Sequence, residues 1–272
     1  PANAVSVGFD AAAANVAAAI AAAFAAAGRS QQPVAAACLG FAGAGQANVR
    51  DRWAGWARAG DRARRIEIVP DGVPAFGSAG PPAWGLVVVS GTGSIVWGRG
   101  LAGPLERCGG RGGLIGDEGS GSAIAVAALR SALRAADGWG PPTGLLPVAL
   151  ARFAASEPNE LPAAVAAAER RMIAAFAPEV IGLAEAGDAE AYRIVGEAAA
   201  DLGRQSLAVA RRLDFAAGEY PLRLTGGLLC HSALLRDSLV EWLTAAHLPP
   251  ASVTIVSDLA LAAASAAAAD VM

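Results

Sequence analysis

Residues 86–94 read LVVVSGTGS, a short apolar run that stops at a turn built from two glycines and two hydroxyl residues. An apolar run of this length, bounded by turn residues, is typical of a strand buried on both faces of a sheet. Gly91 and Gly93 permit positive φ angles and close approach of other backbone, so the N–H groups of the turn could surround an anion. An ordinary hairpin turn would use the same residues. The stretch therefore predicts a buried strand that ends either in a tight turn or in a phosphate site.

The segments on either side of this strand alternate between strand and helix patterns. Strands are expected at residues 34–39, 65–69, 95–98, 105–108, 222–225 and 253–256. Helices are expected at residues 10–27, 48–59, 123–136, 234–246 and 259–269, with several more between 145 and 213. We expect Asp10 to cap the first helix and the loose Gly/Pro/Ala stretch 74–83 to act as a hinge or linker at a domain boundary. This alternation, which has no short-period repeat, predicts an α/β protein.

A second candidate site is the glycine-rich loop at residues 109–121, which reads GGRGGLIGDEGSG. An ordinary helix N-terminus would explain Asp117 and Glu118, whose charges favour the helix dipole, and Ser120 as the cap. It would not explain the many glycines that precede them. Those glycines favour a backbone pressed against a ligand.

Two weaker candidates follow other predicted strands. Gly226-Gly227 comes after strand 222–225 and predicts either a left-handed turn or the seat of a flat ligand such as a nucleotide base. Asp71 ends strand 65–69 at a Pro-Asp-Gly turn, which is a common position for aspartate. His231 reads as a solvated polar residue.

Composition excludes several kinds of chemistry. The sequence has no lysine, so its 21 basic residues are all arginines, and it has two histidines. Mechanisms that need a P-loop lysine or a Schiff-base lysine are therefore excluded. A histidine-built metal site is disfavoured, and the metal ligands, if any, stay unassigned. The formal net charge of −3 argues against a nucleic-acid partner.

Cysteine usage and hydropathy indicate a cytoplasmic protein. Cys38, Cys108 and Cys230 are widely spaced and are expected to be incidental thiols of a reducing compartment. The alanine runs 11–27 and 259–269 lack a stretch of about 20 residues rich in Leu, Ile or Val, so we interpret them as helices of a soluble domain. No signal peptide is visible, and the start at Pro1 need not be the natural one.

Taken in order and spacing, these motifs resemble the BadF/BadG-type branch of the actin–hexokinase–Hsp70 superfamily, and within it the N-acetylglucosamine kinases. The motifs that carry the resemblance are SGTGS (90–94), GG-x-G (109–112), GDEGSG (116–121), the pair 178–180 and 186–188, and Gly226-Gly227. The resemblance implies two ribonuclease-H-like lobes of the actin/hexokinase type around a cleft that holds ATP and sugar. Residues 1–82 would form the sugar-side lobe, residues 83–257 the second lobe, and residues 258–272 a helix packing back on the first.

The same resemblance implies roles for individual residues. The residues implied to contact ATP are Gly91, Thr92, Gly93, Ala186, Gly226 and Gly227, with Thr92 at the phosphates. The residues implied to contact the sugar are Asn3, Ser94, Gly109, Gly110, Arg111 and Asp117. Asp71 matches the proposed general base.

The sequence departs from the family pattern at three places. The first β-hairpin, with its Asp-Gly-Gly-Gly-Thr phosphate loop, is expected to be missing from the N-terminal lobe. Arg111 stands where the sugar kinases usually carry tryptophan, and Ile95 where an asparagine can touch sugar. Gly72 replaces the commoner alanine after the catalytic aspartate.

The function implied is ATP-dependent phosphorylation of an amino-sugar hydroxyl, at O6 of N-acetylglucosamine or glucosamine, with ATP and Mg²⁺. A small-molecule sugar is then the expected partner, with no nucleic acid or membrane and with a possible homodimer. One alternative is a non-catalytic sugar- or nucleotide-binding protein. Another is an ATPase that activates 2-hydroxyacyl-CoA dehydratases, a role that needs cysteine ligands for an iron–sulfur cluster and is disfavoured by the isolated cysteines.

Overall fold

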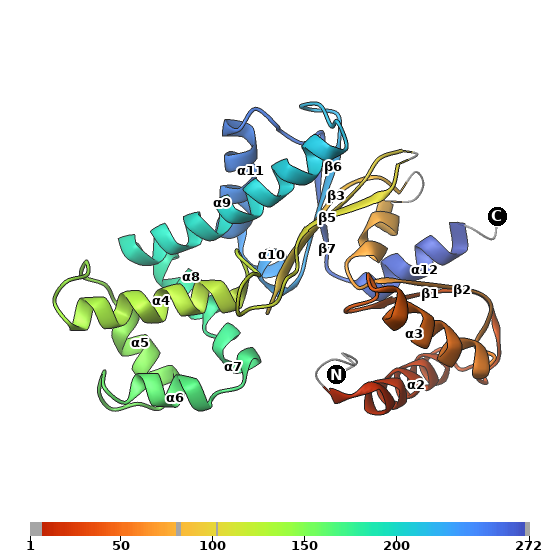
Figure 1. Ribbon diagram of the computed structural model, residues 1–272, viewed down its shortest axis with the longest axis horizontal. Coiled ribbons are helices and arrows are strands. Elements are labelled where there is room, and N and C mark those ends of the chain that lie inside the picture. The colour runs from red at the N-terminus through yellow and green to blue at the C-terminus, as the bar shows by residue number, and fades with distance from the viewer. Residues whose placement is uncertain (1–6, 80–82, 102, 270–272) are drawn as a thin grey trace. The chain divides into compact units, whose positions relative to one another are not determined.

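The computed structural model describes residues 7–79, 83–101 and 103–269 (Figure 1). The chain divides into two compact units, a first unit of residues 1–83 with 258–272 and a second unit of residues 84–257. The sequence predicts boundaries after residues 82 and 257, and the roles it assigns to the two lobes stay a prediction. Asn3 falls outside the described residues.

A βαβ arrangement forms the first unit. Strands β1 (Val34–Phe41) and β2 (Ala63–Pro70) pair in parallel and are connected through helix α3 (Ala47–Ala59). The ring of Trp53, which is fully buried, stacks on Phe41 with 3.8 Å between centroids and also meets Phe9 of helix α2 (Phe9–Ala26) at 4.7 Å. These aromatic contacts hold both helices against β1.

The sequence indicates a hinge or linker over residues 74–83, but residues 73–79 form a 3₁₀ helix, η1 (Val73–Ala79). Residues 73–77 of this helix are buried, and Phe76 is 1% exposed. Gly77 allows close packing of η1 against helix α12 (Leu259–Ala269), because a Cβ at this glycine would lie 2.8 Å from the Cβ of Ala266. The contact joins segments nearly 200 residues apart, so the local sequence pattern could not reveal it.

Helix α2 begins one residue earlier than expected. Its N-cap residue is Gly8, with no side-chain cap, and Asp10 lies in the first turn, so the prediction that Asp10 caps the helix is wrong. Among the described residues, α2 is the one helix long and apolar enough to cross a membrane, with 18 residues and a mean hydropathy of 1.6. Alanine supplies most of this apolar character, and Ala12 and Ala13 pack into the core of the first unit.

The second unit is built on a five-stranded sheet in the order β5-β4-β3-β6-β7. Its strands are β3 (Gly85–Ser90), β4 (Ser94–Arg99), β5 (Leu105–Gly109), β6 (Pro221–Thr225) and β7 (Ser252–Val256). Strands β3, β4 and β5 form an antiparallel meander, whereas β3, β6 and β7 run parallel. The expected strands are therefore present, each to within two residues, and the α/β class is confirmed.

Helices cover one face of this sheet and continue into a helical layer beyond it. They are α4 (Gly121–Ala136), α5 (Leu145–Arg152), α6 (Leu161–Ala167), α7 (Arg170–Ala174), α8 (Ala177–Glu185), α9 (Ala189–Arg212), α10 (Gly227–His231) and α11 (Ala233–Ala245). The long helix α9 packs on β3, β4 and β5, and α4, α8 and α11 pack on α9. Leu86 of β3, Leu224 of β6 and Leu202 of α9 are all fully buried in this core.

Asp188 caps α9 and also ties it to the segment before α5. Its carboxylate accepts hydrogen bonds from the N–H groups of Ala191 (2.9 Å) and Gly144 (2.6 Å) and from the Thr143 hydroxyl (2.9 Å). Burial raises the pKa of Asp188, but these bonds and one from the Glu190 N–H outweigh burial, so the pKa lies below its usual value. The folded protein therefore favours the ionised carboxylate.

We expect Asp188→Ala to lower the free energy of unfolding by about 1–2 kcal/mol near neutral pH, the upper range for loss of a helix cap. Because the folded-state pKa is lowered, this stabilisation is present above the ordinary carboxyl pKa and is lost as the pH falls through the folded-state pKa. Urea unfolding at several pH values measures both effects. Asp201→Ala is the matched control, since Asp201 pairs with Arg204 on the exposed surface. Equal losses in the two variants would contradict the capping role.

Candidate active site

Two of the predicted glycine turns meet at one edge of the second unit's sheet. Because β3 and β6 are parallel neighbours, the turns that follow them emerge side by side. Gly226 has a φ of +91°, and a Cβ there would lie 2.4 Å from the backbone oxygen of Ser90. A Cβ on Gly91 would lie 3.6 Å from the nitrogen of Gly227. The missing side chain of Gly226 therefore allows the two turns to touch, whereas a Cβ on Gly91 would make an ordinary van der Waals contact.

A cavity of about 510 Å³ opens beside these turns, a volume in the range of small-molecule sites. It is lined by Gly91, Thr92, Arg171, Ala174, Ala175, Pro178, Ile181, Gly182, Glu185, Gly227, Leu228, His231 and Ser232. The lining thus comes from the β3 turn, from α7 and α8, and from α10 with the residue after it.

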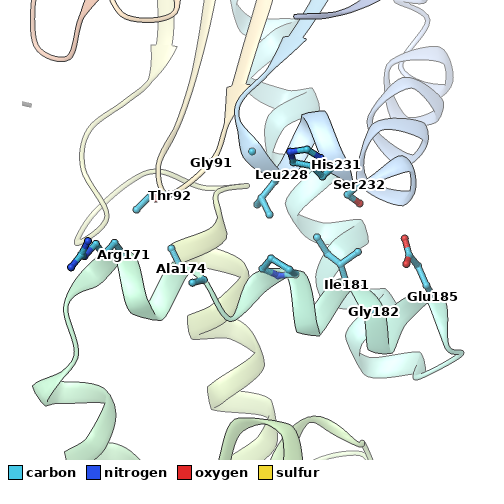
Figure 2. A pocket seen from close by; sticks show the side chains of 13 residues that line it. Gly91, Thr92, Arg171, Ala174, Ile181, Gly182, Glu185, Leu228, His231 and Ser232 are labelled. Carbon is cyan, nitrogen blue, oxygen red and sulfur yellow. The ribbon is translucent and has the colours of Figure 1, made fainter. Parts of the chain in front are cut away.

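The cavity is polar at its two ends and apolar between them. Figure 2 shows Thr92 and Arg171 at one end and Glu185 and Ser232 at the other, with Ile181 along the wall between. A hydroxyl and a guanidinium suit an anionic group, whereas a carboxylate and a hydroxyl suit neutral polar groups. Such an arrangement fits an elongated ligand with one anionic end.

The SGTGS turn and the GDEGSG loop are bonded directly to each other. The hydroxyl of Ser90 donates to the backbone oxygen of Gly119, and that of Ser94 to the backbone oxygen of Glu118, both at 2.7 Å. The N–H of Gly121 donates to the backbone oxygen of Gly91 at 2.8 Å. The serines of the first motif therefore hold the second motif in place. For Ser94, which is buried, the hydroxyl is used inside the protein, and its implied sugar contact stays a prediction.

Asp117 lies at the centre of the glycine-rich loop with a φ of +60° and 5% exposure. One carboxylate oxygen accepts from the N–H of Gly112 at 3.3 Å, and the other forms an ion pair with Arg170. Helix capping is done by Ser120, whose hydroxyl accepts from the N–H of Ala123. The helix-start interpretation is thus confirmed for Ser120 but does not account for Asp117.

The other predicted residues of this loop have mixed surroundings. Gly109 and Gly110 have positive φ angles, and a Cβ on Gly110 would lie 2.5 Å from the side chain of Ile95. Arg111 is exposed. Of the residues implied to contact ATP, Gly91, Thr92 and Gly227 line the cavity, while Gly93, Ala186 and Gly226 are each next to a lining residue in sequence.

Two residues that sequence reasoning missed support the loop. The guanidinium of Arg170 bonds both Asp117 and, through Nε at 3.3 Å, the hydroxyl of Ser122. Gln205 of α9 donates from its side-chain amide to the backbone oxygen of Glu118 at 3.2 Å. A pair of arginines inside an alanine-rich segment was one available signal for Arg170, but nothing local marks Gln205.

Asp71 belongs to the first unit, where it follows the last residue of β2. Asp71 as a whole residue is exposed to solvent. Its carboxyl group is nevertheless desolvated, and this raises the pKa above the usual carboxyl value. Hydrogen bonds from the N–H groups of Asp71 and Gly72 act in the opposite direction and are the weaker effect. The carboxylate is therefore more basic than an ordinary aspartate.

The described ranges contain no group of three or more His, Cys, Asp or Glu side chains that could hold a metal. None of the three cysteines forms a disulfide within the described residues; Cys38 lies in the first unit, and Cys108 and Cys230 lie in the second. Mg²⁺ is commonly held by one or two carboxylates together with substrate phosphates. The His, Cys, Asp and Glu side chains of the described residues do not form a complete Mg²⁺ site on their own.

Comparison with known proteins places these features in context. The sequence profile of the BadF/BadG/BcrA/BcrD ATPase family matches residues 1–263. An N-acetylmuramic acid/N-acetylglucosamine kinase from Clostridium acetobutylicum is 31% identical over 181 residues, which are 66% of this chain and 59% of that protein. An N-acetyl-D-glucosamine kinase from Dictyostelium discoideum is 32% identical over 160 residues, 57% of this chain and 50% of that protein. The chain thus matches only half to three fifths of the length of these curated relatives.

A solved structure is also similar along nearly the whole chain. It is that of an inferred N-acetylglucosamine kinase from Chromobacterium violaceum, with a TM-score of 0.73 at 28% identity. The similarity covers 95% of this chain and 85% of that one.

The two adjacent glycines in the turn after β6 allow a test of how closely this turn approaches the turn after β3. We expect Gly226→Ala to lower the free energy of unfolding by about 2–5 kcal/mol, because it combines a left-handed backbone with a clash against the Ser90 backbone. Gly227→Ala meets nothing within 4 Å and begins a helix, so its stability should be nearly unchanged. Urea denaturation compares the two. Equal destabilisation would contradict the close approach of the turns.

Proposed function

Because the chain belongs to the BadF/BadG/BcrA/BcrD ATPase family, we propose that it is an ATP-dependent sugar kinase that phosphorylates a hydroxyl of an amino sugar. The observation that carries the proposal is the cavity built where the turns after β3 and β6 meet, next to the glycine-rich loop around Asp117. N-acetylglucosamine is the first candidate substrate, with transfer to O6. The names of both curated relatives include N-acetylglucosamine kinase, which supports this choice.

The nucleotide is proposed to lie along the cavity with its phosphates toward Gly91 and Thr92. The N–H of Gly91 donates to the backbone oxygen of Gly93 within the turn, so the groups offered to phosphate oxygens are the N–H and hydroxyl of Thr92. The guanidinium of Arg171 lies at the same end (Figure 2). The adenosine would then lie toward Gly227 and Glu185. This orientation needs no lysine, in keeping with a sequence that has none.

The sugar is proposed to bind against the loop that holds Gly109, Gly110 and Asp117. A carboxylate offers about four lone-pair sites, and Gly112 and Arg170 occupy two of those on Asp117. The rest can accept hydrogen bonds from sugar hydroxyls. The contacts implied for Asn3, Ser94 and Arg111 remain part of this proposal.

Asp71 is proposed as the general base of the transfer. Its carboxylate takes the proton of the sugar hydroxyl as that oxygen bonds to the γ-phosphorus, and the bond from this phosphorus to the β–γ bridging oxygen breaks to release ADP. A raised pKa brings a carboxylate closer to the operating pH and so improves it as a base. Mg²⁺ bound with the nucleotide would neutralise phosphate charge, and the protein supplies position and the proton acceptor.

We expect Asp71→Asn to lower kcat by about 10²–10⁴-fold while the affinities for ATP and sugar stay within a few-fold, because only the proton acceptor is lost. Protonation of Asp71 removes the base, so kcat/KM of the wild-type protein should decline as the pH is lowered. Because the pKa of Asp71 is raised, this decline should begin at a higher pH than it would for an ordinary aspartate. A coupled ADP-release assay across pH checks both expectations.

Asp61→Asn is the matched control, because Asp61 is exposed in another turn of the same unit and asparagine tolerates its positive φ. This control should keep wild-type kcat. More than about a tenth of wild-type kcat in Asp71→Asn would assign Asp71 to turn structure alone.

A further inference from the structure

A continuous polar path links the loop proposed for the sugar to the turn proposed for the ATP phosphates. Its first link is the ion pair between Asp117 and Arg170. In the second, Nε of Arg170 donates to the hydroxyl of Ser122 at 3.3 Å. In the third, that hydroxyl donates to the backbone oxygen of Thr92 at 2.7 Å. All four residues belong to the second unit, so the path does not depend on the placement of the first.

The donor and acceptor groups of Arg170 and Ser122 suit these particular hydrogen bonds, and few other side chains could form them. A guanidinium is a planar fork, so Arg170 can hold a carboxylate and a hydroxyl at the same time, which a lysine ammonium does less rigidly. The Ser122 hydroxyl accepts from Arg170 and donates to Thr92, and therefore uses its proton and a lone pair together. Ser122 is 6% exposed, which limits competition from water.

Helix α7 connects the same two places through its packing. It begins with Arg170. The next residue, Arg171, lines the cavity, as do Ala174 at the end of the helix and Ala175 just after it. A Cβ on Gly121 would lie 3.0 Å from the backbone oxygen of Ala174. A shift of the cavity wall at α7 would therefore move the guanidinium that holds Asp117.

We propose that Arg170 and Ser122 are positioning residues that couple sugar binding at Asp117 to nucleotide binding at Thr92. The inference rests on the proposed function and adds to it a specific route of substrate synergism. A ligand that orders Thr92 would order Ser122 and Arg170, and Arg170 would then hold Asp117 in its receptive orientation. By linkage, each ligand must strengthen the binding of the other by the same factor.

The test is calorimetric titration of N-acetylglucosamine in the presence and absence of a saturating non-hydrolysable ATP analogue. For the wild-type protein we expect the sugar Kd to fall at least about five-fold when the analogue is bound, the lower end of typical coupling. In Ser122→Ala this ratio should drop below about two, while the sugar Kd without nucleotide stays within about three-fold of wild type. The Asp117–Arg170 ion pair does not involve the Ser122 hydroxyl, which is why the binary affinity should survive.

Arg170→Lys is the second variant and guards against misfolding of the first. It keeps a cation for Asp117 but loses the fork, so the ratio should again drop below about two. Two controls should keep the wild-type ratio. In Ser206→Ala the lost hydroxyl bonds only a backbone oxygen of α9, and in Arg204→Lys the arginine pairs with Asp201 on the surface.

The possible outcomes distinguish a failure of the proposed coupling between sugar and nucleotide binding from a failure of the proposed function. A wild-type ratio near one, or an unchanged ratio in both variants, would overturn the coupling while leaving a sugar kinase. Equal weakening of sugar binding with and without nucleotide would also overturn it, since the residues would then only support Asp117. A wild-type protein that binds neither ligand would contradict the proposed function itself.

Discussion

Between β3 and β6, four residue pairs from Leu86↔Leu222 to Val89↔Thr225 lie in parallel register. Every feature of the candidate site in the second unit depends on this pairing. It brings the two strand ends to the same sheet edge, and Gly226 lets the backbones approach so closely that a side chain would collide with Ser90. The cavity then opens beside the two turns, with α7 and α8 as its other wall. A one-residue slip would turn Leu222 and Leu224 out of the core and separate the turns.

The second constraint is the bonding between two motifs that lie more than 20 residues apart. The hydroxyls of Ser90 and Ser94 and the backbone of Gly91 all bond the segment 118–121. The glycine-rich loop is thereby fixed at both of its ends, since Gly110 also donates from its N–H to the backbone oxygen of Ser94. These bonds can hold Asp117 in place at low exposure, although it lies in a loop and not in a helix or strand.

Much of this architecture could be predicted from the sequence, because its signals are local. The run at residues 86–89 and the glycines at 226 and 227 identified buried strand ends, and the strand boundaries were right to within two residues. The motif spacing identified the family, which the profile over residues 1–263 confirms. Ser120 was identified as a cap by the same local logic.

The failures share a physical cause, which is dependence on distant partners. The composition of residues 74–83 indicated a hinge or linker, but residues 74–77 are buried in η1, which packs against α12. Arg170 and Gln205 reach the loop from helices 53 and 87 residues away from their partners, and no local pattern encodes that reach. Ser94 likewise has a structural partner that its motif does not encode, because its hydroxyl donates to the backbone oxygen of Glu118, 24 residues away.

Phosphorus NMR follows the proposed transfer of the γ-phosphate of ATP to a sugar hydroxyl directly. In a mixture of the protein, ATP, Mg²⁺ and N-acetylglucosamine, we expect the γ-phosphate resonance to decline while ADP and a sugar phosphomonoester appear in equal amounts. Omission of the sugar should stop the reaction. Release of inorganic phosphate at a rate independent of sugar, or ATP that persists unchanged, would contradict the proposed kinase activity.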